Sequence, residues 1–179
     1  MLHIGDSMAG AVGIELNRAL EPLGVKGILK YKTASFIPTW AWGEELGVYL
    51  ARFHPDLVVI SLGTNELEIV EPERRGPQIE RLVKRLAGVP CVWLLPPVGA
   101  LPHNGLPEVI RAHASPCVCA DHQEIYPAMP RIGDKIHPTM AARKEWAERL
   151  IAWLAAHRKP TAGRPWEIAE SAATGNSRR

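Results

Sequence analysis

The segment that decides the class of fold is Asp56-Leu57-Val58-Val59-Ile60-Ser61-Leu62, which runs directly into Gly63-Thr64-Asn65. Its centre is a continuous apolar run rich in β-branched residues. Such a run predicts a strand of a parallel sheet that is buried on both faces. Segments with apolar residues at helical spacing lie on either side of it, at 39–53 and 77–87. This strand between two helices is the repeating unit of an α/β fold.

The same alternation of strands and helices extends over most of the chain. Four more strands are predicted at 2–4, 25–31, 91–95 and 117–120, and further helices at 8–20, 107–114 and 139–156. We therefore expect a three-layer α/β/α domain with a five-stranded parallel sheet, covering residues 1–157. From 158 to 179 the composition shifts to Ala, Gly, Ser, Thr and Arg. This stretch is expected to be a poorly ordered tail outside the core, pinned at Trp166.

Composition and charge exclude several classes of protein. The 179 residues include 21 Lys and Arg and 19 Asp and Glu, for a net charge of +2. A nucleic-acid-binding protein usually has a clear basic excess, so we expect no nucleic-acid partner, and the charge favours a neutral substrate over a polyanion. No apolar run approaches the roughly 20 residues that span a bilayer. A hydrophobic content of 46% excludes disorder over most of the chain.

The cysteines and the N-terminus leave the cellular compartment open. Cys91 and Cys117 begin the fourth and fifth predicted strands, which should be neighbours. They could form a disulfide if their Cα atoms lie within about 7 Å, or remain two small buried thiols. A disulfide would favour an oxidising compartment. No signal-peptide pattern precedes Leu2, so the protein is cytoplasmic if Met1 is its true start and secreted or periplasmic if a signal is missing.

Three polar segments lie where a parallel sheet binds its ligands, at the carboxyl ends of its strands. Gly5-Asp6-Ser7 follows the first strand, Gly63-Thr64-Asn65-Glu66 follows the third, and Asp134-Lys135-Ile136-His137-Pro138 precedes the last helix. A serine nucleophile needs a base, usually histidine, that a carboxylate orients. We expect Ser7 to attack, His137 to accept its proton and Asp134 to orient the imidazole. The Asn65 amide would donate to the oxyanion, and Glu66 is given no chemical role.

These three segments resemble the conserved blocks of the SGNH (GDSL-type) hydrolase superfamily, over about residues 2–155. Gly5-Asp6-Ser7 is similar to its first block, Gly63-Thr64-Asn65 to its Gly-x-Asn block, and Asp134-Lys135-Ile136-His137 to its Asp-x-x-His block. The resemblance implies a flavodoxin-like sheet with strand order 2-1-3-4-5. It also implies ester hydrolysis with no metal and no cofactor.

One block departs from the family pattern. A glycine usually follows the second strand, and its backbone N–H joins the oxyanion hole with the N–H of the nucleophile. Here the stretch 31–36 reads Tyr-Lys-Thr-Ala-Ser-Phe. A backbone donor needs a permitted conformation rather than a glycine. The oxyanion hole is therefore expected to comprise Ser7, Ser35 and Asn65, with Ala34 as the alternative to Ser35, in a divergent subgroup of the superfamily.

Each of these residues also has a structural interpretation. Asp6, Ser7 and Asp134 could be helix caps, Asn65 a turn residue and His137 a surface histidine. The order and spacing of the three blocks favour catalysis. Two further residues are expected to bind substrate. These are Trp40, which could instead be a core residue, and Pro97, in a loop that walls the cleft.

The predicted function is a serine esterase that acts on small-molecule or carbohydrate esters through an acyl-enzyme on Ser7. The chain has no obvious insertion that could cover a long acyl chain, and this favours short, acetyl-type groups. The alternatives are a lysophospholipase or thioesterase of the same fold, and a binding module without catalysis. The sequence does not address the oligomeric state.

Overall fold

The computed structural model describes residues 1–98, 103–161 and 163–169. Its centre is a five-stranded parallel sheet in the order β2-β1-β3-β4-β5, as predicted. The second strand starts three residues later than expected; the other four match within two residues at each end. The strands are β1 (Leu2–Gly5), β2 (Ile28–Tyr31), β3 (Val58–Ser61), β4 (Cys91–Leu94) and β5 (Val118–Ala120).

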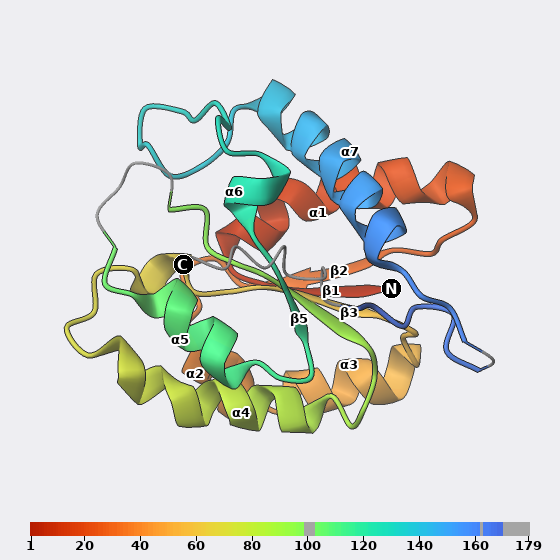
Figure 1. Ribbon diagram of the computed structural model, residues 1–179, viewed down its shortest axis with the longest axis horizontal. Coiled ribbons are helices and arrows are strands. Elements are labelled where there is room, and N and C mark those ends of the chain that lie inside the picture. The colour runs from red at the N-terminus through yellow and green to blue at the C-terminus, as the bar shows by residue number, and fades with distance from the viewer. Residues whose placement is uncertain (99–102, 162, 170–179) are drawn as a thin grey trace, which may run out of the picture.

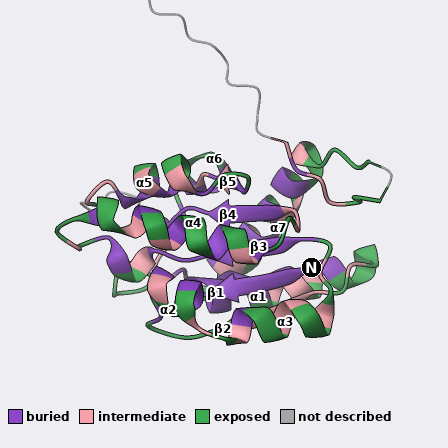
Figure 2. Ribbon diagram, turned by 90° about the horizontal axis from the view of Figure 1, so that it is seen from below, coloured by how far each residue is buried: buried purple, intermediate pink, exposed green. Residues whose placement is uncertain are grey.

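Helices cover both faces of the sheet and complete the three layers (Figure 1). One face carries α1 (Ser7–Leu20), α6 (His122–Ile125) and α7 (Met140–His157); the other carries α2 (Ile37–Trp42), α3 (Glu45–Phe53), α4 (Gly76–Arg85) and α5 (Leu106–His113). Short 3₁₀ turns occupy Glu21–Leu23, Thr64–Glu66 and Pro72–Arg75. A hydrophobic core fills each space between sheet and helices, so the inner strands β1, β3 and β4 are buried, whereas the edge strand β2 is partly exposed (Figure 2). No helix in the described part of the chain is long and apolar enough to cross a membrane.

The helix predicted over 39–53 is two helices, α2 and α3, separated at Gly43. Arg85 on α4 donates hydrogen bonds of 2.6–2.9 Å to the carbonyls of Trp40, Ala41 and Gly43. These contacts satisfy carbonyl groups at the end of α2 that a continuous helix would bond internally. The apolar periodicity continues through the break, so the sequence pattern did not reveal it.

The register of the sheet brings the expected functional loops to one edge. Gly5 at the end of β1 pairs with Tyr31 of β2 on one side and with Ser61 of β3 on the other. The strand β4 continues this register, because its Leu94 pairs with Ser61. The segments after these strands therefore leave the sheet side by side.

At the opposite edge, a disulfide joins the two cysteines that precede or begin adjacent strands. Cys91 and Cys117 are bonded, with their Cα atoms 4.6 Å apart. This outcome is the first of the two that the sequence left open. The bond links β4 to the segment before β5, far from the ends of the strands where the functional loops lie.

The segment after α7 differs from the expected tail. Lys159 donates its backbone N–H to Glu167 at 2.7 Å, and Ala169 donates to His157 at 3.0 Å, so the chain turns back on itself. Ile168 is 8% exposed and packs into the core on the α1 and α7 side. The Arg158 guanidinium lies over the Trp166 ring. Residues 170–179 of the predicted tail lie outside the described part of the chain.

Candidate active site

Ser7 is the first residue of α1, at the carboxyl end of the central strand β1. The preceding Gly5 has a φ of +156°, and a Cβ there would lie 2.0 Å from the Ser61 carbonyl oxygen, so only glycine fits. Asp6 caps the helix, because its Oδ1 accepts the Met8 N–H at 2.8 Å. Ser7 is therefore held at a helix N-terminus, where backbone N–H groups favour negative charge.

The structure brings His137 and Asp134 to Ser7. His137 Nε2 lies 2.8 Å from Ser7 Oγ, and His137 Nδ1 lies 2.7 Å from Asp134 Oδ2. With a proton on Nδ1, the imidazole donates to the carboxylate and accepts the serine hydroxyl. The same carboxylate accepts the backbone N–H groups of Ile136 and His137 at 2.8 and 2.9 Å. The hydrogen bond from His137, followed by these two, lowers the pKa of Asp134 to about 2. Asp134 is therefore ionised at neutral pH and can stabilise an imidazolium.

The loop that carries these two residues is closed on itself. Ile132 donates its N–H to the His137 carbonyl at 2.9 Å, and Lys135 donates to Ile132 at 2.9 Å. Lys135 has a φ of +61°, which completes the tight turn. The spacing of three positions from Asp134 to His137 thus follows from a local turn, and this is why the pair could be recognised in the sequence.

The two expected oxyanion donors beside Ser7 lie on the loops after β2 and β3. The Asn65 side chain donates from Nδ2 to the Ser35 carbonyl at 3.0 Å, which joins the two loops. An amide nitrogen carries two hydrogens, so a second donor remains on Asn65. The Ser35 N–H, the donor expected from the sequence, instead donates to the Lys32 carbonyl at 3.1 Å.

Ala34, the alternative, has a backbone conformation that glycine adopts more readily than other residues. Its φ is +56°, in the left-handed region that favours glycine. Within the described part of the chain, its N–H has no hydrogen-bond partner. The structure therefore favours Ala34 over Ser35 as the second backbone donor. The sequence could not distinguish Ala34 from Ser35, because neither residue type predicts a positive φ.

The comparisons with known proteins support the fold. No family model matches the chain, and no curated protein matches it. Among solved structures, the chain is similar to TesA, with 22% identity, 87% of this chain and 97% of that chain covered, and a TM-score of 0.68. An acetyl xylan esterase has 16% identity, covers 86% and 100% of the two chains and has a TM-score of 0.70. A protein of the G-D-S-L family from Desulfitobacterium hafniense has 15% identity, covers 83% and 95%, and has a TM-score of 0.68.

The fold is that of the SGNH hydrolases. At sequence identities of 15–22%, the similar structures establish only the architecture. The roles of individual residues must be inferred from the distances and hydrogen bonds in this SGNH fold. Among the described residues, no group of three or more His, Cys, Asp or Glu side chains is placed to hold a metal ion.

Trp40, which was expected to bind substrate, does not reach the site around Ser7. Trp40 is 3% exposed and belongs to the core between α2 and the sheet. Its Nε1 donates a hydrogen bond of 2.9 Å to the Ser35 hydroxyl. The prediction was wrong because α2 turns this side chain inward, so Trp40 supports the Ser35 loop. Pro97, the other expected residue, does line the groove beside Asn65.

Glu66 is a component of the site that the sequence analysis missed. Its side chain is fully buried, and Oε2 accepts the Ile37 N–H at the start of α2 at 2.8 Å. Oε1 accepts a hydrogen bond from Arg75. Burial raises the pKa of Glu66, while the bonds from Ile37 and Arg75 lower it. The carboxylate therefore ties the Ser35 loop to the Asn65 loop. A hydrophobic strand followed by Gly-x-Asn-Glu does not show whether the glutamate points inward.

Asp6 is also buried beneath the site. Burial, together with the nearby Glu66 carboxylate, raises the pKa of Asp6 to about 6, against the opposing effects of the Met8 and Thr64 backbone N–H groups and of His137. This carboxyl group adjoins the nucleophile and titrates close to neutral pH.

Proposed function

We propose that this protein is a serine esterase, a hydrolase of carboxylic esters. The observation that carries the proposal is the continuous chain of hydrogen bonds from Ser7 through His137 to Asp134, at 2.8 and 2.7 Å. This arrangement activates a hydroxyl that is otherwise a weak nucleophile. An acetyl xylan esterase and a carbohydrate esterase are among the proteins of similar structure, which supports the same reaction class.

In the proposed mechanism, Ser7 Oγ attacks the ester carbonyl carbon as its proton passes to His137 Nε2. The negative charge on the carbonyl oxygen is bound by the N–H groups of Ser7 and Ala34 and by the Asn65 amide. Collapse of this intermediate expels the alcohol, which takes the proton from His137. Water then attacks the acyl-enzyme by the same route and releases the acid. Asp134 keeps the imidazole in the required tautomer throughout.

We propose short acyl groups, such as acetyl on a carbohydrate, as the substrate class. A groove of about 420 Å³ lies beside Asn65, and it is partly open to solvent. Leu67, Pro97 and Ile136 form its apolar walls, against which a short acyl group could pack. A series of p-nitrophenyl esters tests this proposal. The rate should be highest for acetate, and a maximum at long acyl chains would favour the lysophospholipase or thioesterase alternative.

The test of the reaction itself is the Ser7→Ala variant. Hydrolysis of p-nitrophenyl acetate should fall to the background rate, and a fluorophosphonate should label the parent at Ser7 and leave the variant unlabelled. Ser115→Ala is the matched control, because Ser115 is exposed before β5, at the opposite edge of the sheet. Unchanged hydrolysis by Ser7→Ala would refute the proposal, and absence of any adduct on Ser7 would favour a binding module.

A further inference from the structure

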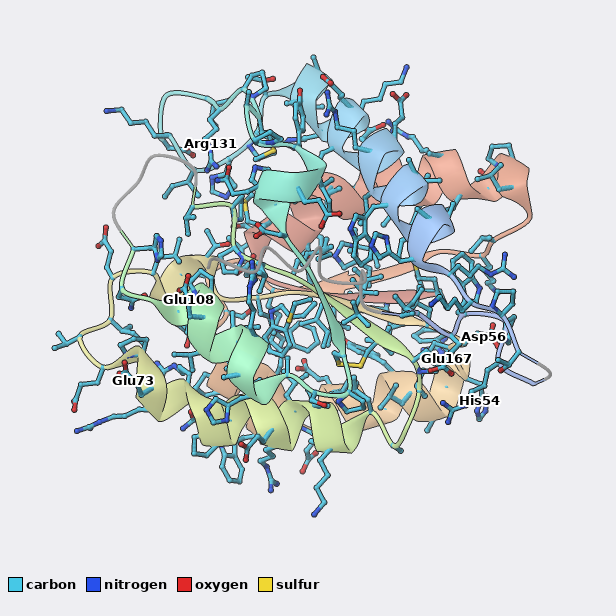
Figure 3. The ribbon with its side chains drawn as sticks, viewed as in Figure 1. His54, Asp56, Glu73, Glu108, Arg131 and Glu167 are labelled. Atoms are coloured by element: carbon cyan, nitrogen blue, oxygen red, sulfur yellow. A yellow bond between two sulfur atoms is a disulfide. The ribbon has the colours of Figure 1, made fainter. Side chains whose placement is uncertain are left out.

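The groove beside Asn65 contains a cation whose charge is not balanced by an ion pair. Arg131 lies on the segment between α6 and α7, at the edge of the sheet where Glu108 lies and opposite the edge of His54 and Asp56 (Figure 3). It lines the groove with Pro97 and Ile136. The arginine is half-buried, and within the described part of the chain no carboxylate forms a salt bridge with it.

The hydrogen bonds of Arg131 fix the guanidinium in place and leave part of it unused. Nη2 donates to the Pro97 carbonyl at 2.6 Å, and Nη1 donates to the carbonyls of Ile136 and Lys135 at 3.1 and 3.4 Å. All three acceptors are neutral. Arginine has five N–H donors. The Nε–H and the second Nη2 hydrogen therefore have no partner among the described residues.

The nearby acids do not form a direct ion pair with Arg131 among the described residues. The Asp134 carboxylate favours the charged form of Arg131, but it makes no salt bridge with it, and its two oxygens are bonded to His137 and to backbone N–H groups. Glu68 also lines the groove, yet it is exposed and makes no salt bridge with Arg131. Burial lowers the pKa of Arg131. A partly buried charge without a partner is unfavourable, and an anionic ligand would relieve it.

We propose that Arg131 is a specificity-determining residue that selects esters carrying a carboxylate close to the scissile bond. The inference depends on the proposed esterase function. The groove adjoins Asn65, which would bind the carbonyl oxygen, and Ile136, which precedes the base His137. A substrate held at Ser7 would therefore extend a neighbouring carboxylate towards the two unused donors. A single carboxylate is compatible with the low net charge of the chain, which disfavours a polyanion.

The test compares charged and neutral esters of matched size. For a carboxylate on the acyl side, the pair is p-nitrophenyl hydrogen glutarate and its methyl ester. For a carboxylate on the alcohol side, the pair is meta-acetoxybenzoate and its methyl ester. We expect kcat/KM for the anionic member of one pair to exceed that of its neutral partner by about tenfold or more, because a hydrogen-bonded charge contributes about 1.5–3 kcal/mol. The pair that shows the preference identifies the side of the ester that carries the charge.

Variants separate selectivity from a structural role, since Arg131 also supports the loop of the catalytic histidine. Arg131→Met should lower the ratio of anionic to neutral kcat/KM at least about tenfold, whatever it does to the overall rate. Arg131→Lys should retain part of the ratio, because it keeps the charge. Glu68→Gln should raise the ratio, because it removes the opposing charge from the groove.

Two results would overturn the inference while leaving the esterase proposal intact. One is a parent enzyme that hydrolyses neutral esters through Ser7 with no preference for either anionic ester. The other is an Arg131→Met variant that loses activity on both members of a pair by the same factor, which would assign Arg131 only the support of the loop. Failure of all esters to react, or reaction without Ser7, would instead refute the proposed function.

Discussion

The substitution Glu66→Gln tests whether a buried carboxylate holds the oxyanion loops together. In the parent, Glu66 accepts the Ile37 N–H with one oxygen and the Arg75 side chain with the other. Glutamine has only one oxygen, so its NH₂ group would face one of the two donors. Removing one partner of a buried ion pair costs about 3–5 kcal/mol. Arg75 is 22% exposed and can be partly hydrated, so we expect the lower end, about 3 kcal/mol.

Urea unfolding at neutral pH measures this loss, and a double-mutant cycle with Arg75→Met assigns it to the pair. The double variant should be less destabilised than the sum of the single variants by at least about 1.5 kcal/mol, because each single change leaves a charge or a donor unpaired. Glu73→Gln is the matched control. Glu73 is exposed on the same 3₁₀ turn as Arg75, so its effect should stay within about 0.5 kcal/mol.

The same variant should affect catalysis through position rather than contact. Glu66 lies between Asn65 and Leu67, which both line the groove. It binds Ile37, which follows the loop whose Ser35 carbonyl accepts the Asn65 amide. We expect Glu66→Gln to lower kcat with little change in KM, since the loops bind the transition state more strongly than the substrate. Additive effects in the cycle, within about 0.5 kcal/mol, together with an unchanged kcat would refute the reasoning.

Three further predictions concern other parts of the molecule. Asn65→Ala should reduce kcat/KM on p-nitrophenyl acetate by roughly 10²–10³ with little loss of stability, which steady-state kinetics and thermal unfolding would measure; an equal rate would exclude Asn65 from the oxyanion hole. Folding raises the pKa of Asp6 from 3.8 to about 6. The free energy of unfolding of the parent should therefore fall by about 3 kcal/mol relative to that of Asp6→Asn as the pH rises from about 4 to about 8. A difference between the two proteins that stays constant with pH would contradict this. Replacing both Cys91 and Cys117 by serine should lower stability by about 2–4 kcal/mol and leave kcat/KM unchanged at a temperature where the variant is folded, because the bond lies at the opposite edge of the sheet from Ser7; a loss of activity without a loss of stability would argue against that separation.

The sequence predicted the parts of this molecule that depend on local pattern. The apolar run at 57–60 indicated a buried parallel strand, and the spacing of the helices around it predicted the three layers. Ser7, Asn65 and His137 could be proposed because each follows a strand or precedes a helix. The carboxyl ends of parallel strands must meet at one edge of the sheet.

The parts that the sequence did not predict depend on conformation or on distant contacts. The choice between Ala34 and Ser35 rests on a positive φ at a residue that is not glycine, and residue type carried no sign of it. The burial of Trp40 and the break at Gly43 depend on how α2 ends against Arg85. Glu66 and Arg131 are ordinary charged residues in the sequence, and only their surroundings in the folded chain distinguish them from surface residues.

The hydrogen bond between Ser7 and His137 joins residues 130 positions apart. The helix α1, which begins at Ser7, and the helix α7, which follows the loop of His137, pack on the same face of the sheet (Figure 1). Bringing Ser7 and His137 together during folding lowers the conformational entropy of the chain between them. This loss is offset only after the intervening strands have paired and formed their own contacts. Under the proposed function, esterase activity therefore reports completion of the whole domain, and its recovery during refolding marks the final assembly of the chain.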